Sequence, residues 1–401
     1  MKIVADGNIP FVAECFSSIG QVKVVGGREI TPAAVRDADI LLVRSVTQVG
    51  PDLLAGSKVR FVGTATIGFD HIDADFLRRN NIGFASAPGS NANSAAEYII
   101  AALLEIGQRF HIDLEGKSIG IIGVGNVGSR VAKKAMALGM KVYLNDPPLQ
   151  RQSLLRRSRL RRRIGDPKYL AIEELFGCDF ITIHTPLTFE GIDKTFHLAD
   201  EKFFRSLKER CVFINASRGG VVDSAALKSA IRSGMLQAVA LDVWENEPNI
   251  DTELLRMVDI GTPHIAGYSL DGKVAGMIMI YKAACEHFKL EPKYDMQDFL
   301  PAPAVRELRI NPGRGTEQDV VAGTVQKIYD IRKDDGRLRR ILERSAEKRG
   351  ELFDSLRKNY PVRREFQNTT VVIATESTEL KAEKLLGKLR GIGFKEGKGE
   401  K

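Results

Sequence analysis

The sequence predicts an α/β protein with two doubly wound parallel-sheet lobes followed by a small C-terminal α/β domain. Three observations favour this fold class: short apolar runs that end in Gly, Asn or Asp, longer helical patterns between them, and a more charged composition after residue 300. The apolar runs contain few alternating polar residues, which is typical of parallel strands that helices cover on both faces. Repeated strand–helix units connect through right-handed crossovers and so build a doubly wound sheet.

The first lobe is expected to contain four strands, each ending close to a polar or turn-forming residue. A long helical pattern over 90–111 leads away from them, and a second helix over 272–288 returns the chain to the first lobe. We therefore predict a first domain over residues 1–97 that is completed by residues 275–300. The expected strands are KIVAD (2–6), DILLVRS (39–45), VRFVGTAT (59–66) and IGFASAP (82–88).

The second lobe shows the same alternation more regularly and predicts a domain over residues 98–274. Residues 301–401 are predicted to form a third, small α/β domain, because the chain becomes more charged after two prolines and contains helical stretches, a short strand at 370–375 and a last helix near 378–389. The strands expected in the second lobe are SIGIIGVG (118–125), KVYLND (141–146), DFITIHTP (179–186), CVFINAS (211–217), AVALDVW (238–244) and DIGTPHIAG (259–267).

Composition argues against several classes of protein. Hydrophobic residues make up 43% and charged residues 27%, a balance typical of globular domains with a packed core. The four cysteines have no paired spacing, so they predict neither a disulfide framework nor a metal site. The N-terminus turns polar too early for a signal peptide, and no apolar run approaches the ~20 residues that a membrane span needs. We expect a cytoplasmic protein with no metal and no membrane partner.

A glycine-rich turn follows the first strand of the second lobe and precedes a helix. Its pattern, G-x-G-x-x-G, allows a tight turn, close approach of a pyrophosphate to the backbone, and close packing of helix on strand. The helix N-terminus offers N–H groups to the phosphates. An acid at the end of the next strand, 18 residues past the last glycine, suits the ribose hydroxyls and favours NAD over NADP. The expected cofactor-binding residues are Gly123, Gly125, Asn126, Val127, Gly128 and Asp146.

A dense basic run follows this acid: seven arginines lie between Arg151 and Arg163 with no acid among them. They nearly account for the formal net charge of +8, so the excess charge is local and gives little support for a nucleic-acid partner. Three interpretations remain open: a solvated surface insertion, a clamp for the 2′-phosphate of NADP, or a surface for a polyanion or a partner.

Three residues further along have the types and positions that a hydride-transfer site needs. Arg218, Glu247 and His264 each follow a predicted parallel strand, at the edge where open α/β sheets bind ligands. A histidine suits proton removal from a hydroxyl near neutral pH, and a carboxylate orients its ring. An arginine binds a substrate carboxylate with a planar fork. Taken singly, each has a structural alternative: a core histidine, a surface ion pair and a solvated acid.

These motifs resemble those of the D-isomer-specific 2-hydroxyacid dehydrogenases. The resemblance rests on GVGNVG, NASRG, ENEP and PHIAG and covers residues 1–290. Further stretches are similar to the branch of the family that oxidises 4-phospho-D-erythronate in pyridoxal 5′-phosphate (vitamin B6) biosynthesis. They are LLVRSVT (41–47), FVGTATIGFDHID (61–73), NDPP (145–148), HIAGYSLDGK (264–273), LPAP (300–303), YDIRKDD (329–335) and FDSLRKNYPVRREF (353–366).

The resemblance implies a Rossmann NAD domain, a flavodoxin-like substrate domain, a homodimer, and a C-terminal domain used in dimerisation. It implies that Arg218 and Glu247 are catalytic and that His264 is the proton donor and acceptor. It also implies that Ser45 and Thr66 contact the substrate, with Tyr268 at the edge of the site. The residues themselves add that both hydroxyls lie at strand ends, with Arg44 nearby as a possible phosphate ligand. Further cofactor contacts would come from Thr185, Ala216, Ser217, Arg218, Asp242 and Gly267.

Two other functions stay open at this point. One is a related dehydrogenase that acts on 3-phosphoglycerate or another D-2-hydroxy acid. The other is a non-catalytic protein on the same fold, such as an NAD sensor or a DNA-associated factor that uses the arginine run. The presence of all three catalytic residue types favours an enzyme over a sensor. The C-terminal segment favours a phosphorylated four-carbon substrate over other hydroxy acids.

Overall fold

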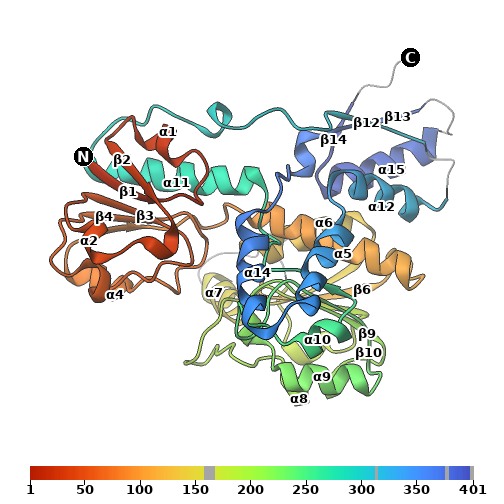
Figure 1. The fold of residues 1–401 in the computed structure, drawn as a ribbon. Coiled ribbons are helices and arrows are strands. Elements are labelled where there is room, and N and C mark those ends of the chain that lie inside the picture. Colours follow the sequence, from red (N-terminus) through yellow and green to blue (C-terminus); the bar gives the residue numbers. More distant parts are fainter. Residues whose placement is uncertain (158–167, 312–314, 375–378, 398–401) are drawn as a thin grey trace. The chain divides into compact units, whose positions relative to one another are not determined.

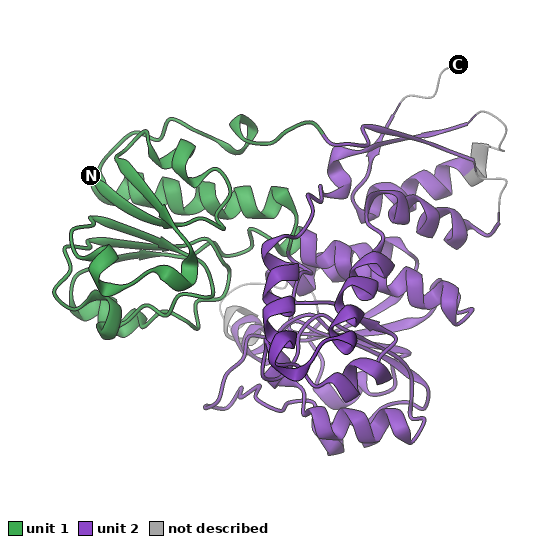
Figure 2. Cartoon of the chain, in the orientation of Figure 1, with its two compact units in different colours: residues 1–93, 268–302 green, residues 94–267, 303–401 purple. Residues whose placement is uncertain are grey.

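The computed structural model describes residues 1–157, 168–311, 315–374 and 379–397. These residues form two compact units, coloured separately in Figure 2. Unit 1 contains residues 1–93 and 268–302, and unit 2 contains residues 94–267 and 303–401. Both units are built from parallel sheets and helices, which confirms the predicted α/β fold class.

Unit 1 contains a five-stranded parallel sheet with strand order β2-β1-β3-β4-β5 (Figure 1). All four predicted strands are present, but β2 was not anticipated. Three of its five residues are exposed at the sheet edge, so it lacks the continuous apolar run of a central strand. The strands are β1 (Lys2–Asp6), β2 (Gln21–Val25), β3 (Ile40–Val43), β4 (Phe61–Thr64) and β5 (Gly83–Ala85).

Helix α11 and four shorter helices belong to unit 1 with this sheet. The returning helix α11 (Leu270–Phe288) is capped by Ser269, whose Oγ accepts the Gly272 N–H at 2.9 Å. Its Met277, Ile280 and Tyr281 are buried in one core cluster with side chains of β1, β3 and β4. The helix therefore belongs to the core of unit 1. The other helices are α1 (Val12–Phe16), α2 (Pro32–Val35), α3 (Pro51–Leu54) and α4 (Ala74–Arg79).

Unit 2 contains a six-stranded parallel sheet with strand order β11-β10-β9-β8-β6-β7. Its central strands are buried along their whole length, as their Ile-, Val- and Phe-rich sequences predict. The strands are β6 (Ser118–Ile122), β7 (Lys141–Asn145), β8 (Phe180–Ile183), β9 (Cys211–Asn215), β10 (Leu236–Leu241) and β11 (Ile260–Gly261). The helices are α5 (Ala92–Arg109), α6 (Asn126–Ala137), α7 (Pro147–Arg157), α8 (Glu201–Ser206), α9 (Ser224–Arg232) and α10 (Thr252–Met257).

The C-terminal residues of unit 2 add a three-stranded parallel sheet with order β12-β13-β14. Only β13 was predicted, because β12 mixes charged and apolar residues and β14 has two exposed residues. Helix α15 packs against α6 (Figure 1). The elements are β12 (Glu307–Ile310), α12 (Glu317–Ile328), α13 (Ile331–Arg339), α14 (Ala346–Lys358), β13 (Thr370–Ile373), α15 (Glu379–Ile392) and β14 (Lys395–Glu396).

The predicted domain bounds, with a third domain over 301–401, stay predictions, and residues 303–401 share a compact unit with 94–267. The physical reason is a common core. Leu338, Ile341 and Phe353 of the C-terminal segment are buried in the same cluster as Phe213 and Trp244 of the second lobe. Burial of such side chains stabilises by about 1.5–3 kcal/mol each, so the segment depends on this lobe for its stability.

Membrane-spanning helices and metal clusters are both absent from the described part of the chain. No described helix combines the length and the apolar character that crossing a membrane requires. Within the same residues, no group of His, Cys, Asp and Glu has an arrangement that could hold a metal ion. All four cysteines are buried and unpaired, and burial raises the pKa of Cys15 and of Cys211 to about 12. Their thiols are therefore protonated at neutral pH.

Asp179, at the start of β8, connects two neighbouring strands of the second sheet. It accepts hydrogen bonds from Ser118 N and Oγ on β6, at 2.9 and 2.7 Å, and from Lys208 Nζ at 2.6 Å. Burial alone would raise the pKa of Asp179, but these bonds outweigh it and lower the pKa to about 2. The ionised carboxylate therefore stabilises the fold above its unfolded pKa of 3.8, and this stabilisation is lost as the pH falls through about 2.

We expect Asp179→Asn to lower the free energy of unfolding by about 2 kcal/mol at pH 7, from the size of the pKa shift. The difference from wild type should shrink as the pH falls from about 4 toward 2. Urea denaturation at several pH values measures it. Asp37→Asn is the control, because the Asp37–Lys58 ion pair is exposed and contributes little. A pH-independent difference for Asp179→Asn would contradict the interpretation.

Candidate active site

The glycine turn connects β6 to α6, and its geometry leaves space for a bound dinucleotide. Gly123 has φ of +86°, a conformation that side chains rarely adopt. A Cβ on Gly128 would lie 2.0 Å from the Gly123 carbonyl oxygen, so helix and strand approach too closely for any side chain. A Cβ on Gly125 would have nothing within 4 Å. The N-cap of α6, Gly125, makes no side-chain cap bond, which suits phosphate binding at the helix N-terminus.

Two polar side chains beside the turn fit a dinucleotide. Asp146 follows β7, and its carboxylate accepts the N–H groups of Val124 and Leu149 at 2.8 and 2.9 Å. The carboxylate is therefore fixed next to the turn, where a ribose would lie. Thr185 follows β8 and lies against Gly123. Its Oγ1 is buried without a hydrogen-bond partner in the described part of the chain, which fits a site where a ligand supplies the missing bond.

His264 and Glu247 form a close pair at the same edge of the sheet. His264 Nδ1 and Glu247 Oε2 are 2.7 Å apart, and Glu247 Oε1 accepts the Trp244 N–H at 2.9 Å. Both oxygens of Glu247 are therefore occupied. Burial alone would raise the pKa of Glu247, but His264, through its charge and its hydrogen bond, and Arg357 outweigh burial and lower it. The carboxylate stays ionised and orients the imidazole.

The loop that carries His264 is fixed by a buried carboxylate. Asp242, at the end of β10, accepts the Ile265 and Ala266 N–H groups at 2.7 and 2.8 Å and the Thr262 hydroxyl at 2.6 Å. Burial raises the pKa of Asp242, although these hydrogen bonds and His264 oppose the rise. His264 itself has φ of +57°, an uncommon conformation for a histidine. The Asp242 bonds keep the loop in this strained shape.

Arg218 lies on a turn that contacts the Glu247 loop. Asn215, at the end of β9, orders the turn, since its side chain donates to the Arg218 carbonyl at 3.0 Å and accepts from Ser217 N and Oγ. A Cβ on Gly219 would lie 2.0 Å from the Trp244 carbonyl oxygen, so the two loops pack backbone to backbone. The structure thus brings the loops of Arg218, Glu247 and His264 together within unit 2.

Unit 1 carries the candidate substrate residues at the carboxyl ends of its own strands. Ser45 is exposed after β3, and Thr66 follows β4 with its hydroxyl bonded to the Gly68 carbonyl at 2.9 Å. Tyr268 lies just before α11, with the Arg44 guanidinium 5.3 Å and the Lys273 ammonium 4.4 Å from its ring centre. This edge of unit 1 is therefore cationic, which suits an anionic ligand.

Several residues that organise the site were missed from the sequence. Asn215 and Thr262 act through hydrogen bonds inside the loops. Asp242 was predicted as a cofactor contact, but its carboxylate binds the backbone of the His264 loop. The available signal was position, because Asn215 is the last residue of a buried strand and Asp242 and Thr262 directly follow buried strands. The backbone N–H groups that they bind cannot be identified from spacing alone.

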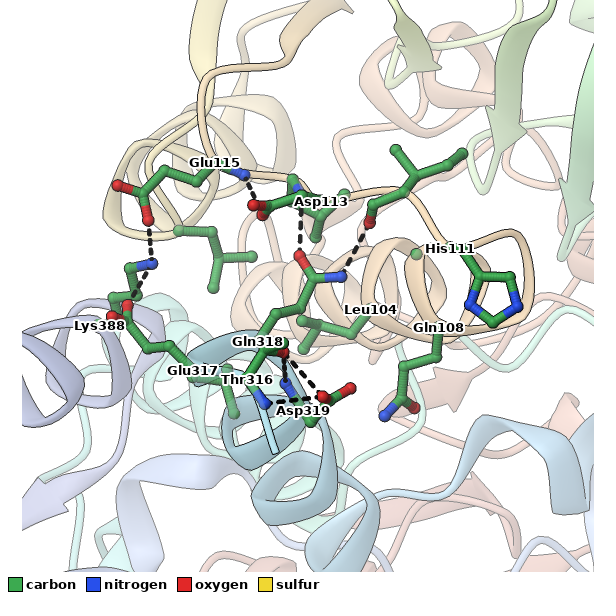
Figure 3. Close-up of a pocket in the computed structure, with 15 residues that line it drawn as sticks. Leu104, Gln108, His111, Asp113, Glu115, Thr316, Glu317, Gln318, Asp319 and Lys388 are labelled. Atoms are coloured by element: carbon green, nitrogen blue, oxygen red, sulfur yellow. Dashed lines mark hydrogen bonds and ion pairs between the residues drawn. The ribbon is translucent and has the colours of Figure 1, made fainter. Parts of the chain in front are cut away.

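A cavity of about 550 Å3 lies elsewhere in unit 2 and shares no residue with the glycine turn (Figure 3). It lies between the end of α5 and the start of α12. Its polar groups bind one another: Gln318 bridges Ile112 O and Leu114 N, and Lys388 pairs with Glu115 and Glu317. We assign it no part in the chemistry.

Known proteins resemble this chain along nearly its whole length. An erythronate-4-phosphate dehydrogenase of Cronobacter sakazakii is 43% identical over 387 residues, which cover 96% of this chain and 97% of that protein. One of Hahella chejuensis is 41% identical over 397 residues, which cover 98% and 99%. The chain belongs to the erythronate-4-phosphate dehydrogenase family. Residues 102–266 match the model of the D-isomer specific 2-hydroxyacid dehydrogenase NAD binding domain, and residues 299–387 match a domain of unknown function, DUF3410.

Solved structures show the same fold. D-lactate dehydrogenase from Aquifex aeolicus, complexed with NAD and lactic acid, is 25% identical, with a TM-score of 0.59 over 72% of this chain and 96% of that one. The TT0316 protein of Thermus thermophilus shares the fold, with 23% identity and a TM-score of 0.62 over 73% and 99%. The family resemblance and the NAD cofactor predicted from the sequence are confirmed, and the protein is an NAD-dependent dehydrogenase.

Only part of the arginine run lies within the described residues. Its first residues belong to α7, and Arg151 pairs with Asp193, with Nη1 at 3.1 Å from Oδ1. Residues 158–163 fall outside the described residues. The three interpretations of the run therefore remain predictions.

We expect Gly128→Ala to weaken NAD binding by more than about tenfold, because the new methyl group would displace α6 from the phosphate site. It should also lower the melting temperature. Calorimetric titration with NAD and a thermal melt measure the two effects. Gly177→Ala is the matched control, since a Cβ there meets nothing within 4 Å. Unchanged NAD affinity in Gly128→Ala would rule out this turn as the phosphate site.

Proposed function

We propose that this protein oxidises 4-phospho-D-erythronate at C2 to 2-oxo-3-hydroxy-4-phosphobutanoate in pyridoxal 5′-phosphate biosynthesis. The observation that carries the proposal is the 2.7 Å His264–Glu247 pair at the sheet edge that also holds the glycine turn. The identity of 43% to an erythronate-4-phosphate dehydrogenase, over almost the full chain, supports the choice of substrate.

His264 acts as the base in this proposal. Its Nδ1 is engaged by Glu247, so Nε2 is the nitrogen left to take the proton of the C2 hydroxyl. The ionised Glu247 stabilises the imidazolium that results and keeps the ring in one orientation. Its second oxygen is fixed by Trp244 N, so the carboxylate cannot rotate away during turnover.

Arg218 binds the substrate carboxylate and polarises the C2 oxygen. A guanidinium offers two parallel N–H groups to a carboxylate, which fixes the substrate against rotation. When bound, NAD accepts the hydride that leaves C2. Asp146 and the α6 N-terminus bind its ribose and phosphates, and Thr185 gains a partner for its buried hydroxyl. An acid at Asp146 disfavours the 2′-phosphate of NADP.

Ser45, Thr66 and Tyr268 are the proposed substrate contacts of unit 1. The cations beside Tyr268 suit a doubly charged phosphorylated acid. The family also supports a homodimer and a cytoplasmic location, which we retain as proposals. No observation on the described residues favours the non-catalytic alternative, since Arg218, Glu247 and His264 are all present with their loops in contact.

We expect His264→Ala to lower kcat/KM by a factor on the order of 10²–10⁴, the usual contribution of a general base. NAD affinity should change little, because His264 lies on a different loop from the glycine turn. His197→Ala is a matched control: His197 pairs with Glu245 at 2.8 Å, and both imidazoles are 33% exposed. Equal losses in the two variants, measured by steady-state kinetics, would show that the effect is not catalytic.

We expect 4-phospho-D-erythronate to be oxidised with a kcat/KM at least about tenfold above those of 3-phospho-D-glycerate and D-lactate. We further expect NAD to be preferred over NADP. A spectrophotometric panel of the three acids with each cofactor measures both ratios. If 3-phospho-D-glycerate is the best substrate, the proposed function is wrong but the family assignment remains.

A further inference from the structure

The C-terminal segment returns to the loops that carry the catalytic pair. In α13, Asp335 Oδ1 accepts the Gly261 N–H at 2.8 Å, on the strand that leads into the His264 loop. Arg339 donates to the carbonyls of Leu255 and Val258 at 3.0 and 2.8 Å, at the end of α10. These contacts attach the segment to the backbone on the N-terminal side of the histidine.

Helix α14 lies against the Glu247 loop. A Cβ on Gly350 would lie 2.7 Å from Asn249 Oδ1, two residues after Glu247, so the helix approaches this loop closely. Phe353, one turn later, is fully buried in the cluster that includes Trp244. Arg357, a further turn along, is one of the groups that lower the pKa of Glu247. The same helix therefore packs beneath the loop and adds a positive charge near its acid.

Arg363, just beyond α14, contacts the His264 loop directly. Its side chain is buried, and Nη2 donates to the Ala266 carbonyl at 2.7 Å and to Ser94 Oγ at 2.5 Å. Ser94 Oγ donates to the same carbonyl at 3.1 Å. The guanidinium also lies 4.1 Å from the ring centre of Tyr329. Nε and Nη1 have no hydrogen-bond partner among the described residues, so Nη2 and the Tyr329 ring hold the guanidinium in place.

The loop is thus fixed from two sides. Asp242 binds its N–H groups at Ile265 and Ala266, and Arg363 binds its carbonyl at Ala266. His264, two residues before that carbonyl, has a positive φ that isolated backbone would relax. A strained residue keeps its conformation only when its surroundings determine it from several directions. For His264, the contact from Arg363 comes from the C-terminal segment.

We propose that Arg363 is a positioning residue for His264, and that the domain of unknown function thereby forms part of the catalytic apparatus. This inference rests on the proposed function, in which His264 is the base. Arg363 acts through the loop backbone and does not touch the reacting atoms. Without it the Ala266 carbonyl keeps, among the described residues, the Ser94 hydroxyl as its hydrogen-bond donor, and the imidazole samples positions away from the substrate hydroxyl. A misplacement of about 1 Å is enough to slow a reaction on the order of 100-fold.

The test is Arg363→Met in the full-length protein. We expect kcat to fall on the order of 10- to 100-fold, with the affinity for NAD within about twofold of wild type. Arg363→Lys keeps the charge and one donor and should recover part of the loss. Arg364→Met is the matched control, because Arg364 is the next residue and its Nη2 donates to Asn368 Oδ1 at 2.9 Å, a partly buried bond away from the Ala266 carbonyl. A kcat in Arg363→Met equal to that of Arg364→Met would overturn the proposal.

Hydrogen exchange separates this inference from the proposed function. The amides of Ile265 and Ala266 should exchange faster in Arg363→Met than in wild type or Arg364→Met, whether or not a substrate is known. If the amides respond but wild type does not oxidise 4-phospho-D-erythronate, the proposed function fails and the positioning role remains. Unchanged exchange in folded Arg363→Met would overturn the positioning role. If Arg363→Met does not fold, kcat and amide exchange are measured in Arg363→Lys instead. Wild-type values of both in Arg363→Lys would overturn the positioning role of Arg363.

Discussion

The buried carboxylate of Asp242 is the constraint on which the rest of the site depends. It accepts three hydrogen bonds from the short segment between Thr262 and Ala266. Hydrogen bonds to a charged acceptor contribute about 1.5–3 kcal/mol each, enough to offset the cost of one uncommon backbone conformation. His264 can therefore adopt its positive φ and reach Glu247. Without this anchor, the proposed catalytic pair of His264 and Glu247 would lose a constraint on its geometry.

The parallel sheet of unit 2 supplies the framework for this constraint. The proposed cofactor and catalytic groups come from residues that follow the six strands β6 to β11, which run parallel and end at one edge. Rigid strands place the first residue of each loop, and short-range hydrogen bonds then fix the side chain. Asn215 does this for the Arg218 turn, and Asp242 does it for the His264 loop. The loops that carry Arg218 and His264 are therefore held in one conformation by Asn215 and Asp242.

The sequence predicted the features that depend on local patterns. Gly123, Gly125 and Gly128 were recognisable because strand, turn and helix follow one another along the chain, and buried strands such as β8 and β9 read as continuous apolar runs. Strand β2 was missed because it is an exposed edge. The role of Arg363 could not be foreseen, since Ala266 and Ser94 are 97 and 269 residues away from it. Such contacts follow from tertiary packing, which spacing does not encode.

The closeness of Gly219 to Trp244 has a consequence for how this enzyme can diverge. The atoms that would oppose a side chain at Gly219 belong to the main chain of Trp244 and Glu245. A bulky neighbouring side chain can be trimmed by a second mutation, but a carbonyl is present whatever residue occupies its position. No compensatory substitution can therefore make room there. The junction between the Arg218 turn and the Glu247 loop therefore admits only glycine at position 219.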